Sequence, residues 1–154
     1  MIVPLTAACL AAAAQTYVLP PVALYGILRV EGGREGLAKP NRNRTEDLGP
    51  FQVNTSWLKT FRDYWRQPDE RTTYQLLRDN GCASAYAAAA ILRYHVQNTG
   101  DLDAAIGRYH TGPAGSAAEA ARYLRAYRYV MRFDRLPPRK DEKHAAADDA
   151  RSLR

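Results

Sequence analysis

Apolar residues recur along most of the chain at three- and four-residue spacing, which is the period of a helix that buries one face. No stretch alternates clearly between apolar and polar residues, as a half-buried strand does. Prolines, glycines and polar clusters divide the helical pattern into segments. The pattern therefore predicts an all-α or mainly α-helical fold, with helices over residues 7–18, 21–31, 51–65, 72–80, 82–97, 102–109 and 117–133.

Several helix ends carry recognisable signals. Pro20 and Pro21 end the first helix, and Pro21 suits the first turn of the second. Asp101 is expected to cap a short helix. Ser116, with Glu119 three residues later, forms a capping-box pattern at the start of the last helix.

The length of 154 residues suits one domain with a real core, which is expected over residues 7–133. After Leu136-Pro137-Pro138 the chain becomes charged and rich in alanine. Such a composition cannot bury enough apolar surface to fold, so residues 134–154 are predicted to form a disordered tail.

Glu31 ends the apolar helical stretch over residues 22–30 and precedes two glycines. It shares one face with Leu24, Ile27 and Leu28, so its carboxyl group is predicted at the edge of the buried stripe. A carboxylic acid with apolar walls keeps its proton near neutral pH, because burial disfavours the charged form. A protonated acid facing a cleft is what cleavage of a glycosidic bond requires. The alternative interpretation is a solvated residue at a helix end.

Three short motifs follow one another in the chain: Val30-Glu31-Gly32-Gly33, then Asp47-Leu48-Gly49-Pro50-Phe51-Gln52-Val53-Asn54, then Gly107-Arg108-Tyr109-His110-Thr111-Gly112. In this order they resemble the Glu-Ser, Gly-Leu-Met-Gln and Ala-Tyr-Asn motifs of the lytic transglycosylase (SLT) domain family. The resemblance is closest to the small, disulfide-bearing members that accompany type IV secretion, conjugation and type III secretion. It implies a lysozyme-like fold, related to goose-type lysozyme, with a substrate cleft.

The resemblance also implies roles for four residues. Glu31 would be both the acid and the base of the reaction. As the acid it would protonate the bond between N-acetylmuramic acid and N-acetylglucosamine. As the base it would help the muramoyl C6 hydroxyl attack its own anomeric carbon, which leaves a 1,6-anhydromuramoyl end. Gln52 matches the glutamine that lines the cleft and touches substrate. Phe51 takes the place of the methionine, as an apolar wall near Glu31. Tyr109 matches the tyrosine whose hydroxyl orients the catalytic carboxylate.

The motifs depart from the family pattern at three positions. Gly32 stands where the family has a serine that contacts substrate, and Pro50 stands where it has a leucine. His110 replaces the asparagine after the tyrosine. Gly32 and His110 are still expected beside the substrate, but the changes make a catalytically weak wall-binding module an open alternative.

Ordinary glycosidases use a second carboxylate. Glu35, Glu46 and Asp47 are the candidates by position, but all three lie in a polar loop and no pattern fixes them opposite Glu31. No His, Cys or Asp cluster has the spacing of metal ligands, so no metal and no other cofactor is expected. His95 is interpreted as a surface or packing residue.

The two cysteines, Cys9 and Cys82, are too few and too far apart to suggest a zinc site, and composition alone leaves them as free thiols or a disulfide. The resemblance implies that they pair, and hence that the protein is periplasmic or otherwise exported to the bacterial cell envelope. The apolar segment over residues 1–14 has no positively charged start and is too short to span a bilayer. It is interpreted as leading into the mature first helix, and no transmembrane segment is predicted.

A net charge of +6 and a pI near 9.5 favour an anionic partner, and both nucleic acid and peptidoglycan fit. The chain shows no nucleic-acid-binding motif, so no nucleic acid partner is expected. The leading hypothesis is a peptidoglycan lytic transglycosylase that opens the wall for an envelope-spanning secretion or conjugation machine. A hydrolytic lysozyme-type muramidase, a wall-binding module and a basic nucleic-acid-binding helical domain are the alternatives.

Overall fold

The computed structural model describes residues 1–134, and the mainly α-helical fold predicted from the sequence is confirmed. Seven α-helices occur in this part of the chain: α1 (Ala7–Thr16), α2 (Pro21–Glu31), α3 (Leu58–Tyr64), α4 (Glu70–Asp79), α5 (Gly81–Thr99), α6 (Leu102–Thr111) and α7 (Ala117–Asp134). A short 3-10 helix, η1 (Thr55–Trp57), precedes α3. The predicted disordered tail lies outside the described residues, except that its first residue closes α7.

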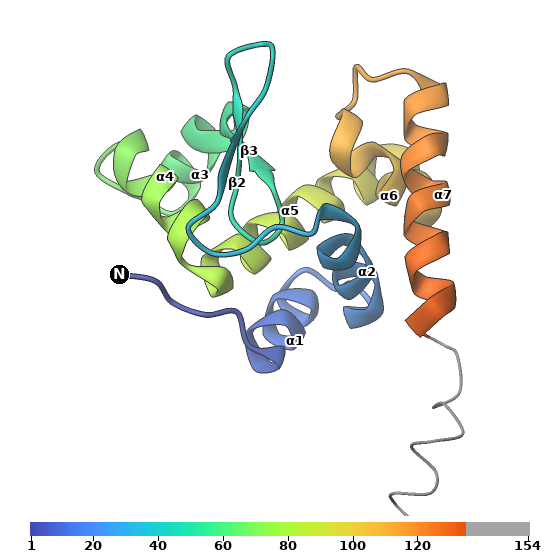
Figure 1. Cartoon of the computed structure of the whole chain (residues 1–154), viewed down its shortest axis with the longest axis horizontal. Helices are drawn as coiled ribbons and strands as arrows, with labels where there is room; N and C mark the ends of the chain where they lie inside the picture. Colours follow the sequence, from blue (N-terminus) through green and yellow to red (C-terminus); the bar gives the residue numbers. More distant parts are fainter. Residues whose placement is uncertain (135–154) are drawn as a thin grey trace, which may run out of the picture.

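Helix α5 runs through the middle of the molecule and packs against α1, α4 and α6 (Figure 1). Its run of small residues lets these neighbours approach closely, and Ala85, Ala87, Ala88 and Ala89 have no exposed surface. Longer apolar side chains from the surrounding elements fill the space around it: Leu24, Ile27, Leu48, Leu77 and Ile106. The core is therefore built around a central helix with little side-chain bulk, which holds α1, α4 and α6 in fixed positions.

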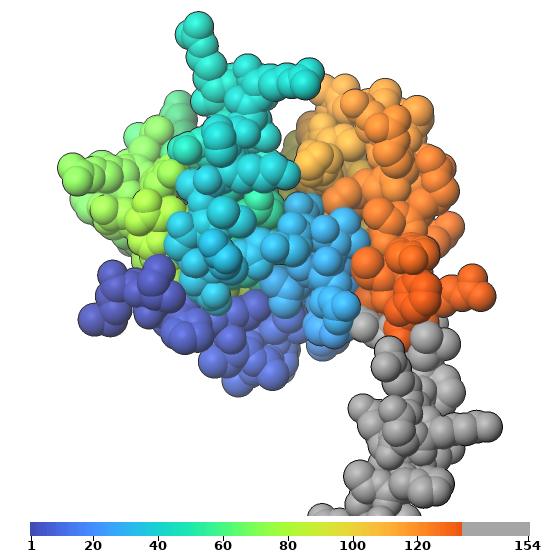
Figure 2. Space-filling model, viewed as in Figure 1, coloured from blue at the N-terminus to red at the C-terminus, as the bar shows by residue number. Residues whose placement is uncertain are grey.

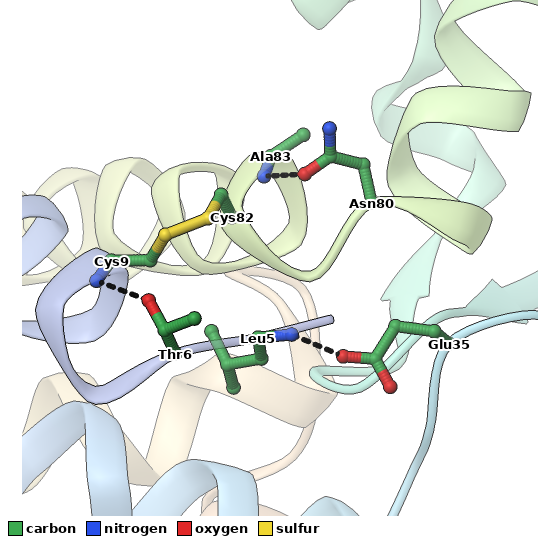
Figure 3. Close-up of a disulfide and its surroundings, with 7 residues drawn as sticks. All are labelled: Leu5, Thr6, Cys9, Glu35, Asn80, Cys82 and Ala83. Carbon is green, nitrogen blue, oxygen red and sulfur yellow. Dashed lines mark hydrogen bonds between the residues drawn. A yellow bond between two sulfur atoms is a disulfide. The ribbon is translucent and has the colours of Figure 1, made fainter. Parts of the chain in front are cut away.

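A disulfide between Cys9 of α1 and Cys82 of α5 confirms the predicted pairing (Figure 3). The two Cα atoms are 5.3 Å apart, although 73 residues separate the cysteines in the sequence. The same figure shows the backbone N–H of Leu5 donating to the carboxylate of Glu35 at 2.6 Å. The N-terminal segment is thus fastened both to α5 and to the loop that follows α2.

The helix-end signals are borne out in the structure. The Asp101 side chain accepts a hydrogen bond from the Ala104 N–H at the start of α6. Ser116 and Glu119 form both bonds of a capping box at the start of α7.

No helix within residues 1–134 is long and apolar enough to cross a membrane. In the same range, no three His, Cys, Asp or Glu side chains lie together as a metal site would require.

The predicted helix over residues 51–65 is wrong in its first half, because the helix begins only at Leu58. Gln52 has a φ of 49°, a left-handed conformation that no regular helix contains. Asn54 is extended, and its side chain accepts a hydrogen bond from the Ser56 N–H, which starts η1. Apolar spacing does not report such local conformations, so the pattern extended the helix too far.

A small antiparallel sheet, which the pattern did not predict, has three strands: β1 (Ala38–Pro40), β2 (Glu46–Leu48) and β3 (Val53–Asn54). In its register Asp47 lies opposite Lys39 on one side and Asn54 on the other. Strands of two or three residues are too short to produce a visible alternation in the sequence. The loop between β1 and β2 projects from the top of the molecule in Figure 1.

Candidate active site

A cleft of about 480 Å³ lies between the sheet and the C-terminal end of α6. Figure 2 shows the surface hollowed between the cyan β-hairpin and the orange part of the chain that follows α6. Four of the site residues predicted from the sequence line this cleft: Glu31, Gln52, Tyr109 and His110. The fold therefore brings residues of all three motifs into one cleft, although they lie up to about 80 positions apart in the chain. The sequence hypothesis requires this arrangement.

Glu31 is the last residue of α2 and is partly buried at the cleft. Burial raises the pKa of its carboxyl group above the ordinary value for glutamate. A hydrogen bond from Tyr123 and the nearby His110 act in the opposite direction, whereas the negative charge of Asp47 adds to the rise in this pKa. Burial is the largest of these effects, so Glu31 keeps its proton to a higher pH than a solvated glutamate does. The solvated interpretation of Glu31 is wrong.

The hydroxyl that holds Glu31 belongs to Tyr123 of α7, and not to Tyr109 as the family resemblance implied. Tyr123 donates a hydrogen bond of 2.6 Å to Oε1 of Glu31, and 8% of its residue surface is exposed. Tyr109 instead donates at 3.0 Å to the backbone carbonyl of Phe51. The last helix carries several tyrosines, and no pattern in the sequence singles out Tyr123 among them.

Phe51 does not form part of the cleft wall, which corrects its expected contact with substrate. Its side chain has no exposed surface and belongs to the hydrophobic core. Its backbone N–H lies 3.4 Å from the Ser84 hydroxyl, and its carbonyl accepts the bond from Tyr109. Phe51 thus fastens the turn that carries Gln52 onto α5 and α6.

Gln52 lines the cleft from this turn, and its side-chain amide donates to the Gly49 carbonyl at 2.8 Å. Gly33 packs directly on the same turn, because a Cβ atom placed there would collide with that carbonyl oxygen. Gly32 ends α2 with a φ of 59°, is exposed and has open space where a side chain would be. Gly32 is not among the residues that line the cleft, although the sequence placed it beside the substrate.

His110 is exposed at the rim, and its ring lies nearly parallel to that of Tyr123, with centroids 5.7 Å apart. It lines both the main cleft and a second cavity of about 470 Å³ beside α7. His95 lines the cleft but is buried, and its Nε2 has no partner among residues 1–134. Burial lowers the pKa of His95, so its imidazole is neutral and belongs to the packed floor of the cleft.

The two tryptophans differ in position. Trp57 lines the cleft, where its flat ring is available to a sugar face. Trp65 stacks on Phe61 with ring centroids 4.7 Å apart and takes no part in the cleft lining. An indole ring, an acid and several side-chain amides line the same cleft, a combination that suits a carbohydrate chain.

Residues 8–128 match the family model of the transglycosylase SLT domain. A comparison with curated proteins finds no match to the chain. The family match spans most of the sequence, and its range includes the acid of α2, the turn before η1 and the tyrosines of α6 and α7 that surround the cleft.

Proposed function

Because the chain belongs to the SLT transglycosylase domain family, whose members act on peptidoglycan, we propose that it cleaves the β-1,4 bond between N-acetylmuramic acid and N-acetylglucosamine and leaves 1,6-anhydromuramoyl ends. The observation that carries this proposal is the state of Glu31. It is a partly buried acid with a raised pKa, it lies in a cleft, and Tyr123 holds it by a hydrogen bond. Such an acid carries the proton that the leaving oxygen needs.

The reaction uses Glu31 twice. Its proton moves to the glycosidic oxygen as the bond to the anomeric carbon breaks, and the electron pair of that bond stays on the oxygen. The carboxylate then accepts the proton of the muramoyl C6 hydroxyl, whose oxygen forms the new bond to the anomeric carbon. The hydrogen bond from Tyr123 favours the charged form of Glu31 and thus assists the first proton transfer. Glu31 ends the cycle protonated, and no water is consumed.

The test is a digest of purified peptidoglycan followed by mass spectrometry of the soluble products. The wild-type chain is expected to release 1,6-anhydromuramoyl ends, and Glu31→Gln is expected to lower the rate by roughly 100- to 10,000-fold. Glu70→Gln serves as the control, because Glu70 is exposed on α4 and does not line the cleft. Lysis by Glu31→Gln at the wild-type rate would show that Glu31 is not the acid.

The same digest separates the second candidate function, a hydrolytic muramidase. Asp47 lines the cleft with Glu31, and a second carboxylate is the group that hydrolysing glycosidases use. Reducing muramoyl ends in place of anhydro ends would assign the hydrolytic reaction. Binding to peptidoglycan without any soluble product would assign the wall-binding role.

We propose further that the protein works in an oxidising compartment of the cell envelope, the periplasm or its equivalent, and that it opens the wall for a secretion or conjugation machine. The Cys9–Cys82 disulfide supports the first part, since such bonds persist where thiols are not kept reduced. The second part rests on the resemblance to small secretion-associated members. A deletion strain complemented with wild-type or Glu31→Gln protein tests it, because transfer or secretion should recover only with the wild type.

A further inference from the structure

The structure separates the three carboxylates that the sequence left as equal candidates for a second acidic group. Glu35 accepts a hydrogen bond from the backbone N–H of Leu5 (Figure 3), and it does not line the cleft. Glu46 accepts a hydrogen bond of 3.0 Å from the hydroxyl of Tyr74 in α4. Asp47 alone of the three lines the cleft. Successive residues of a strand point to opposite faces, so β2 turns Glu46 towards α4 and Asp47 towards the cleft.

The carboxylate of Asp47 is held in one orientation by its neighbour in the sheet. The side-chain amide of Asn54 donates to Oδ1 of Asp47 at 2.7 Å and to the Thr45 hydroxyl at 2.9 Å. Asn54 is itself fixed, because its oxygen accepts the Ser56 N–H at 3.0 Å. Within residues 1–134, Oδ2 of Asp47 receives no hydrogen bond. One carboxylate oxygen is thus anchored, and the other is left for whatever occupies the cleft.

The negative charge of Asp47 also affects the ionisable groups of Glu31 and Tyr109. Its negative charge contributes to the raised pKa values of Glu31 and of Tyr109. These groups stand on α2 and α6, so the carboxylate on β2 faces them across the space that the glycan would fill. No basic side chain is paired with Asp47 in the described chain, and its charge is therefore not neutralised by a salt bridge.

We propose that Asp47 is a second catalytic carboxylate, which stabilises the positive charge that develops on the muramoyl ring when the glycosidic bond breaks. The inference rests on the proposed function and extends it from one acid to two. As the anomeric carbon loses its bond, the leaving oxygen takes both electrons and the proton of Glu31, and the ring carries the positive charge. Asp47 neither gains nor loses a proton in this step. Its fixed charge is already in place when the ring becomes positive, which is the condition under which electrostatic stabilisation is most effective.

The experiment compares Asp47→Asn with the matched variant Glu46→Gln on peptidoglycan. Asp47→Asn keeps an oxygen that accepts from Asn54, so the sheet is expected to survive, and thermal unfolding checks that it does. We expect a loss in kcat of roughly 100-fold or more, with KM changed little, because the charge is needed only in the transition state. Glu46→Gln should retain its activity within a few-fold. The basic limb of the pH–rate profile of Asp47→Asn should move to lower pH, since the charge that raises the pKa of Glu31 is gone.

The outcomes are distinct from those that test the proposed function. A folded Asp47→Asn protein with wild-type kcat, beside an inactive Glu31→Gln protein, would overturn the role of Asp47 and leave the single-acid reaction intact. Absence of lysis by the wild type would overturn the proposed function itself. If Asp47→Asn fails to fold, Asp47→Ser decides, because it removes the charge with a smaller polar side chain: a folded protein with wild-type kcat counts against the inference. Reduced kcat at unchanged KM and unchanged unfolding temperature supports it.

Discussion

The hydrogen bond to Glu31 comes from Tyr123, where the family resemblance implied Tyr109, and this difference can be tested. Tyr123→Phe removes the only hydroxyl that bonds Glu31 within residues 1–134, while the phenyl ring still fills the same space beside His110. A hydrogen bond to a charged group contributes about 1.5–3 kcal/mol, and each 1.4 kcal/mol in the barrier is about tenfold in rate. Since the bond favours the carboxylate that forms as Glu31 gives up its proton, kcat should fall roughly 10- to 100-fold.

The pH dependence gives this prediction a sign. In the proposed reaction Glu31 acts as an acid only while it is protonated, so the rate should fall as the pH rises through its pKa. The bond from Tyr123 lowers that pKa. Removing the hydroxyl must therefore raise the pKa further, and the basic limb of kcat/KM should move to higher pH in Tyr123→Phe. The measurement is a series of initial lysis rates across pH, with wild-type and variant protein at equal concentration.

Tyr109→Phe is the matched comparison. Its hydroxyl bonds the buried carbonyl of Phe51, so its removal leaves an unsatisfied acceptor and should cost about 1–3 kcal/mol of unfolding free energy. The basic limb should stay where it is, because Tyr109 makes no hydrogen bond to Glu31 in the described structure. If Tyr109→Phe moves the limb and Tyr123→Phe does not, the assignment of the orienting hydroxyl is refuted.

Three further outcomes follow from the fold. Reduction of the Cys9–Cys82 bond, or replacement of both cysteines by serine, should lower the free energy of unfolding by about 4 kcal/mol, as expected for a loop of this length. Denaturant titration measures this difference. An unchanged free energy of unfolding would mean that the bond does not constrain the unfolded chain. Gly33→Ala should lower the free energy of unfolding by about 1–3 kcal/mol through overpacking, because its methyl group would meet the backbone carbonyl of Gly49; an unchanged unfolding midpoint would contradict this contact. Glu31→Gln should be more stable than the wild type at neutral pH but not in acid. The folded pKa lies above the unfolded value, so the wild type loses stability as pH rises between the two; a difference independent of pH would count against the raised pKa.

The sequence located most of the helices and the acid, because these depend on local signals. Glu31 follows a continuous apolar helix and precedes glycines, and the structure places it at the end of α2 as expected. The turn before Gln52 was also marked by Gly49 and Pro50. The strands escaped notice because two or three residues are too few to show a period of two.

Assignments that depend on where one helix lies against another could not be made in this way. The family resemblance implied Tyr109 as the partner of the acid, but the packing of α7 along α2 brings the hydroxyl of Tyr123 to Glu31 instead. Phe51 was expected at the surface of the cleft, but the turn that carries it rotates its ring into the core.

The sequence by itself determined a helical domain with one well-placed acid and a cysteine pair, since spacing, capping residues and motif order are properties of neighbouring positions. Tertiary structure alone decided which hydroxyl holds that acid and which of three loop carboxylates shares its cleft. The physical reason is that a hydrogen bond or a charge acts over a few ångströms in space, and the distance between Glu31 and Tyr123 along the chain, 92 residues, carries no information about that separation.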